Sequence, residues 1–188
     1  MPLLGEHQLA NATTAVAVAN LLPGLGVHIS EEAVAQGLRQ VHWPGRLEVL
    51  SRAPLLVVDG AHNADSARKL AMALKTYFQY ERLFLIFGTS LDKDIDGMLR
   101  ELLPLVHQAV VTQARHPRAT EVQSLKERLL AQGCEPLFSH NVTGALDCAL
   151  GLAQERDLIC ATGSLFVVAE VREAWARRQG AEMIERDP

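Results

Sequence analysis

Polar residues that can bind a ligand follow four short apolar segments of this chain. They are residues 59–63 (DGAHN), 88–90 (GTS), 113–118 (QARHPR) and 162–164 (TGS). Glycine, hydroxyl, carboxylate and imidazole groups are what a site for a polar, phosphorylated ligand uses. The residue types therefore indicate such a site, provided that the fold brings the four segments to one place.

Asp59 and His62 are the residues of the first segment with the clearest chemistry. A carboxylate offers two acceptor oxygens to the vicinal hydroxyls of a ribose, and Gly60 lets the chain turn sharply after Asp59. Asp59 can equally be the N-cap of the helix that follows. His62 can contact a phosphate or orient a substrate, or it can bond a loop carbonyl. The residues alone leave both pairs of alternatives open.

Ser164 and Arg46 can each bind an anion. Gly163 and Ser164 precede a helix, whose free N–H groups and positive dipole end can hold a carboxylate or phosphate; an ordinary serine cap is the alternative. Arg46 lies where the sequence pattern changes. It can reach across a cleft to a phosphate, or it can form a surface ion pair.

Three common signatures are absent from the sequence. It has no GxxxxGK[ST] phosphate loop and no GxSxG elbow, and its Gly24-x-Gly26 pair follows a helix and lacks a third glycine. The missing GxGxxG after the first strand argues against a flavodoxin-like or NAD-binding protein.

From residue 46 the chain alternates strand-like and helix-like segments. The strands are expected at 47–50, 55–58, 83–87, 108–112, 135–138 and 157–162, and the helices at 65–78, 95–103, 120–132, 142–154 and 164–178. The first two strands can form a hairpin, and Thr120 with Gln123 suggests a capping box. This order predicts an α/β fold with a mostly parallel sheet and helices on both faces, in which ligands bind at the carboxyl ends of the strands. The wholly apolar residues 83–87 predict a central strand.

The first 43 residues have a different pattern. An alanine-rich helix is expected at 7–22, and a second helix runs to about Val41 after an N-cap at Ser30. Because two helices do not make a domain, we expect residues 1–43 to be the end of a preceding domain and residues 44–188 to form a second one.

Composition excludes several classes of protein. The 188 residues are 48% hydrophobic and carry a net charge of −4, which argues against a nucleic-acid or anionic-membrane partner. No apolar run reaches the roughly 18 residues that a membrane span needs, and the start does not resemble a signal peptide. Cys134, Cys148 and Cys160 lack metal-ligand spacing, so we expect free thiols in a cytoplasmic protein.

Six motifs, in order, resemble the folylpolyglutamate synthase/dihydrofolate synthase branch of the Mur ligase superfamily. They are residues 5–12 (GEHQLANA), 43–48 (WPGRLE), 59–63 (DGAHN), 92–94 (DKD), 116–119 (HPRA) and 162–165 (TGSL). The resemblance implies a Rossmann-like C-terminal domain, preceded here by the closing helices of the central ATPase domain. It also implies an ATP-dependent ligase that converts a folate or dihydropteroate carboxylate to an acyl phosphate, which L-glutamate then attacks.

The resemblance also implies the roles of individual residues. Gln8 and Asn11 match adenine contacts, Arg46 matches an arginine that reaches the ATP phosphates when the domains close, and Asp59 matches the ribose ligand.

Two further roles concern the acceptor amino acid. His62 matches a residue near the phosphates and the incoming amino acid, and Ser164 matches a glutamate contact. Phe166 stands where the family often has tyrosine, so no hydroxyl acts there.

The P-loop and the Mg²⁺ ligands that the family keeps upstream are missing from this chain. We therefore expect Met1 to begin a fragment that is inactive alone, and the resemblance implies that the parent enzyme is a monomer. Two alternatives remain: another Mur-type ligase that acts on a cell-wall nucleotide precursor, and a stand-alone α/β module that binds a nucleotide or a partner.

Overall fold

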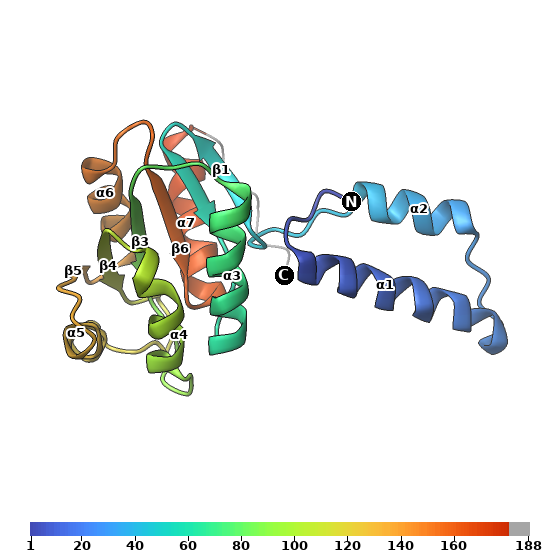
Figure 1. Ribbon diagram of the computed structural model, residues 1–188, viewed down its shortest axis with the longest axis horizontal. Helices are drawn as coiled ribbons and strands as arrows, with labels where there is room; N and C mark the ends of the chain where they lie inside the picture. The colour runs from blue at the N-terminus through green and yellow to red at the C-terminus, as the bar shows by residue number, and fades with distance from the viewer. Residues whose placement is uncertain (181–188) are drawn as a thin grey trace. The chain divides into compact units, whose positions relative to one another are not determined.

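The computed structural model describes residues 1–180 and divides into two compact units, Met1–Pro44 and a second unit that begins at Gly45. The first unit holds helix α1 (Glu6–Leu21), a 3₁₀ turn (Leu22–Leu25) and helix α2 (Glu31–Gln40) (Figure 1). Ser30 caps α2, as predicted, since its side chain accepts a hydrogen bond from the backbone N–H of Ala33.

The second unit contains a six-stranded sheet in the order β1-β2-β6-β3-β4-β5. Its strands are β1 (Glu48–Arg52), β2 (Leu55–Val58), β3 (Leu83–Phe87), β4 (Gln108–Thr112), β5 (Leu137–Ser139) and β6 (Leu158–Thr162). β1 and β2 form the predicted antiparallel hairpin, and every other pair is parallel. All five residues of β3 are buried between β6 and β4, which confirms it as a central strand.

Helices cover both faces of this sheet (Figure 1). They are α3 (Ala64–Tyr77), α4 (Ile95–Leu102, followed by a 3₁₀ turn at Leu103–Leu105), α5 (Val122–Ala131), α6 (Val142–Leu152) and α7 (Leu165–Arg178). The apolar faces of α6 and α7 pack on one side against alternate residues of the strands, such as Leu56, Phe84 and Val110. The α/β fold with a mostly parallel sheet is therefore as the sequence predicts.

The predicted capping box of α5 is wrong. The N-cap is Glu121, without a side-chain cap, and Gln123 donates to Glu127 instead. Thr120 is drawn into the interior because its backbone N–H donates to the carbonyl of Thr89, and its hydroxyl is buried without a hydrogen-bond partner. Strand β5 also begins two residues later than predicted, since its pairing with β4 starts at Leu137.

Candidate functional site

The polar segments that follow β2, β3, β4 and β6 lie at one edge of the sheet, because these strands are parallel and their carboxyl ends meet there. Glycines let the strand ends approach closely. A Cβ on Gly163, whose φ is +104°, would lie 2.6 Å from the carbonyl oxygen of Gly88, and a Cβ on Gly88 would lie 2.5 Å from that of Thr112. Side chains at these points would force the strand ends apart.

Asp59 ties two backbone segments together. Its Oδ2 accepts a hydrogen bond from the N–H of Leu47 at 2.8 Å, and its Oδ1 accepts one from the N–H of Ala61 at 2.9 Å. The alternative that Asp59 caps the next helix is wrong, because Asn63 is the N-cap of α3. A carboxylate oxygen can accept more than one hydrogen bond, and this is the chemistry that a ribose hydroxyl requires.

Arg46 lies in a tight turn that Asp59 anchors. Leu47 is buried and adopts a left-handed conformation with φ +44°, and Gly45 has φ +74°. Arg46 itself is exposed and has no hydrogen-bond or ion-pair partner among residues 1–180. Residues 1–180 therefore provide no surface ion pair for Arg46, and its guanidinium is exposed.

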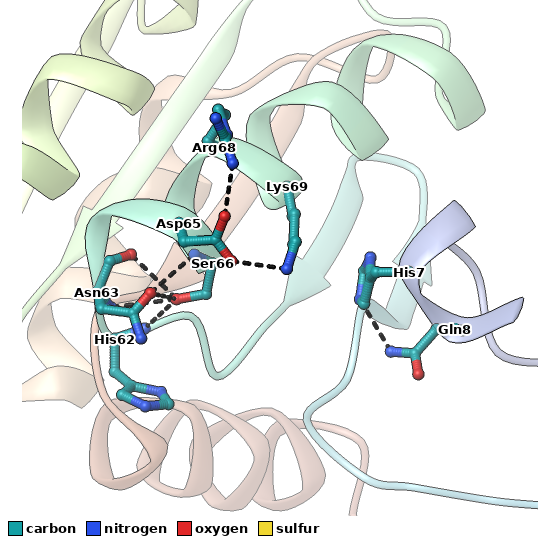
Figure 2. A network of polar contacts seen from close by, with 8 residues as sticks. All are labelled: His7, Gln8, His62, Asn63, Asp65, Ser66, Arg68 and Lys69. Carbon is teal, nitrogen blue, oxygen red and sulfur yellow. Dashed lines mark hydrogen bonds and ion pairs between the residues drawn. The ribbon is translucent and has the colours of Figure 1, made fainter. Parts of the chain in front are cut away.

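His62 begins a network of polar contacts at the start of α3 (Figure 2). Asn63 and Ser66 form a capping box, and the backbone N–H of His62 donates to the Ser66 hydroxyl at 3.0 Å. The ring Nδ1 lies 2.9 Å from the carbonyl oxygen of Gly60. Since a carbonyl can only accept, Nδ1 donates, and in the neutral form of an imidazole this leaves the lone pair on Nε2.

Asp65 takes part in an exposed cluster in the first turn of α3. Its carboxylate contacts Lys69 and Arg68, each at 2.6 Å (Figure 2). Hydrogen bonds from Lys69 and then Arg68 lower the pKa of Asp65. Because all three side chains are well exposed, these pairs add little stability.

Ser164 is the N-cap of α7 and is buried. Its hydroxyl oxygen accepts from the N–H of Phe166 at 3.1 Å, so it makes the ordinary cap that was one of its two predicted roles. The O–H hydrogen remains a potential donor to a ligand. Phe166 stacks on His116 with ring centroids 3.8 Å apart, which joins the β4 end to the start of α7.

Gln8 and Asn11 lie in the first unit, on one face of α1. Asn11 Nδ2 donates to Gln8 Oε1 at 3.0 Å, and Gln8 Nε2 lies 3.0 Å from His7 Nε2 (Figure 2). Gln8 is buried. The two amides are thus neighbours, as their spacing predicts.

The structure thus brings Arg46, Asp59, His62 and Ser164 to one edge of the second unit. Gly163, beside Ser164, donates its N–H to the carbonyl of Ala61 at 3.1 Å, and Gly60 donates to the carbonyl of Gly45 at 2.9 Å. Gln8 and Asn11 belong to the other unit.

Residues 1–180 contain neither a metal-ligand cluster of three His, Cys, Asp or Glu side chains nor a helix long and apolar enough to cross a membrane. The three cysteines are free thiols, as predicted, with Cys160 buried and the other two half-buried. Burial raises the pKa of the Cys160 thiol far above its usual value.

Comparison with known proteins decides the family. The model of the Mur ligase, glutamate ligase domain, matches residues 45–165. This chain belongs to the Mur ligase family. The resemblance seen in its motifs is therefore confirmed.

Several proteins that are similar to this chain have names that concern folate. A probable bifunctional folylpolyglutamate synthase/dihydropteroate synthase from Haloferax volcanii is 39% identical over 180 residues, which is 94% of this chain and 21% of that protein. The structure of Mycobacterium tuberculosis folylpolyglutamate synthase complexed with ADP and AMPPCP matches all of the chain and 42% of its own length, with 31% identity and a TM-score of 0.83.

A third similar protein has been solved with an amino acid bound. The structure of a bifunctional folylpolyglutamate synthase/dihydrofolate synthase with Mn, AMPPNP and L-glutamate bound is 34% identical, with a TM-score of 0.77, over 88% of this chain and 39% of its own. The chain therefore spans less than half the length of each of these proteins.

Proposed function

We propose that this chain is the glutamate ligase part of an ATP-dependent folylpolyglutamate synthase/dihydrofolate synthase. The observation that carries the proposal is the exposed Arg46, which has no partner among residues 1–180, on a turn anchored by Asp59 at the carboxyl edge of the sheet. An arginine beside a carboxylate suits a nucleotide, since the guanidinium can bind phosphate oxygens and the carboxylate can bind ribose hydroxyls. The names of the three similar proteins described above support the same substrates.

The proposed reaction has two steps. A carboxylate oxygen of the folate or dihydropteroate substrate attacks the γ-phosphorus of ATP, the bond to ADP breaks, and an acyl phosphate forms. The amino nitrogen of L-glutamate then attacks the acyl carbon, the C–O bond to phosphate breaks, and an amide remains. Arg46 stabilises the phosphate oxygens as negative charge moves between them.

Two residues of the second unit act on glutamate in this proposal. The amine must lose a proton as it attacks, and Nε2 of His62 is free to accept it because Nδ1 is bonded to the Gly60 carbonyl. Ser164 and the N-terminus of α7 bind a glutamate carboxylate through the O–H hydrogen and the helix dipole.

The remaining parts of the nucleotide site come from the first unit and from outside this sequence. We propose that residues 1–43 are the closing helices of the ATPase domain, and that Gln8 and Asn11 hydrogen-bond the adenine. Residues 1–180 contain no cluster of side chains that could bind Mg²⁺. We therefore propose that the Mg²⁺ ligands, like the P-loop, belong to the ATPase domain.

We further propose a cytoplasmic monomer whose partners are these small molecules. Free thiols suit a reducing compartment, and the net charge of −4 does not favour nucleic acid or anionic lipid. Size-exclusion chromatography with light scattering tests the monomer.

A substrate panel tests the function. The protein expressed from the complete reading frame that encodes this chain is mixed with ATP, Mg²⁺ and L-glutamate, and ADP release is measured with dihydropteroate, with a reduced folate, or with a cell-wall nucleotide precursor. We expect ADP release only when glutamate and a pteroate-type substrate are both present. ADP release with the cell-wall precursor alone would show that the protein is another Mur-type ligase. Nucleotide binding without ADP release would show that the chain is a binding module.

A further inference from the structure

The turn that carries Arg46 is held by a second carboxylate besides Asp59. Glu48 Oε2 accepts a hydrogen bond from the N–H of Gly45 at 2.6 Å, which closes the turn around Arg46. The same oxygen lies 2.8 Å from Nε of Arg172. Glu48 therefore connects the turn to α7, the helix that Ser164 caps.

The turn needs such anchors because its backbone is strained. Leu47 has φ +44°, a conformation that side chains other than glycine rarely adopt. Three backbone groups of the turn are fixed: the N–H of Gly45 by Glu48, the carbonyl of Gly45 by Gly60, and the N–H of Leu47 by Asp59. The Arg46 side chain projects from this fixed backbone without a partner of its own among the described residues.

We propose that Glu48 is a positioning residue for Arg46, and that Arg172 holds Glu48 in place. The side chain of Glu48 is only 17% exposed, so neighbouring residues restrict its movement. Glu48 holds the turn closed before a nucleotide binds, so the Arg46 guanidinium is already placed to bind phosphate. Less conformational entropy of the turn is then lost on binding. This inference rests on the proposed function, in which Arg46 contacts the ATP phosphates.

A double-mutant cycle tests the inference. In the protein from the complete reading frame, kcat and KM for ATP are measured from glutamate-dependent ADP release for the wild type, Glu48→Ala, Arg46→Ala and the double variant. We expect Glu48→Ala to lower kcat/KM for ATP about tenfold or more, and to have no further effect when Arg46 is already alanine. If Glu48 had only a structural role, the fold losses in kcat/KM of the two single variants would multiply in the double variant. That result would overturn the inference.

Glu48→Gln is the matched control. Glutamine keeps an oxygen that accepts from the N–H of Gly45, so we expect it to restore kcat/KM to within about threefold of wild type. If Glu48→Ala does not fold, Arg172→Gln replaces it, with a loss of about threefold or more that also disappears in the Arg46→Ala background. An unchanged rate in Arg172→Gln then overturns the inference.

The outcomes separate this inference from the proposed function. Wild-type kinetics for Arg46→Ala would refute the proposed role of Arg46. Slow kinetics for Arg46→Ala together with wild-type kinetics for Glu48→Ala would refute only the positioning role of Glu48.

Discussion

Replacing Gly163 with alanine tests whether the strand ends at the candidate site are as closely packed as described. Gly163 has φ +104°, and a Cβ there would lie 2.6 Å from the carbonyl oxygen of Gly88 and 3.0 Å from the ring of Phe87. The carbonyl belongs to the backbone and cannot rotate away. Backbone strain of about 1–3 kcal/mol and overpacking of about 1–3 kcal/mol together predict a loss of roughly 2–6 kcal/mol in the free energy of unfolding.

Gly133→Ala is the matched control for Gly163→Ala. Gly133 also has a positive φ, +78°, but a Cβ there would meet nothing within 4 Å. Only the strain remains, and we expect a loss of about 1–2 kcal/mol. The difference between the two variants therefore measures the crowding at the strand ends.

Urea unfolding followed by the fluorescence of Trp175 is the assay. Trp175 packs against the core, whereas Trp43 is 59% exposed, so a Trp43→Phe background makes the signal report on the second unit. With a slope of about 2 kcal/mol per M, the midpoint falls by about 1–3 M for Gly163→Ala and by about 0.5–1 M for the control. Equal shifts in the two variants would refute the account of the packed strand ends.

Three further changes have expected outcomes that thermal or urea unfolding can check. Gly151→Ala, near the end of α6 with open space around it, raises stability by about 0.5–1 kcal/mol; a lower melting temperature would contradict this. Asn63→Ala removes the α3 capping box and costs about 1 kcal/mol, and an unchanged midpoint would show that water replaces the cap. Hydrogen bonds from Arg82 lower the pKa of the buried Asp157, so this pair stabilises the fold above the unfolded pKa of about 4 and its contribution is lost as pH falls through the lowered value. Asp157→Asn therefore costs about 2 kcal/mol at pH 7 and less at pH 3, and a cost that does not depend on pH would refute this account.

The periodicity of the chain predicted the second unit well, because its strands are short apolar runs and its helices are amphipathic. Leu83–Phe87 could be identified as a central strand since all five residues are apolar. The start of α5 was predicted wrongly because a tertiary hydrogen bond from Thr120 to Thr89 outweighed the local capping pattern.

The candidate site could be predicted only in part. Motif order pointed to Arg46 and Asp59, and both lie at the carboxyl edge of the sheet. The link between Glu48 and Arg172 could not be predicted, because it joins residues far apart in the sequence that only the packing of α7 brings together. The stacking of His116 on Phe166 was missed for the same reason.

The central claim is that Arg46, presented by an anchored turn, acts on the ATP phosphates. The most direct measurement is the rate of glutamate-dependent ADP release at saturating ATP for Arg46→Ala, made in the protein from the complete reading frame, with urea unfolding as the control for folding. The account predicts a fall of about 100-fold or more, as for other removed donors to developing charge, with an unchanged unfolding midpoint because Arg46 is exposed. A wild-type rate in the folded variant would contradict it.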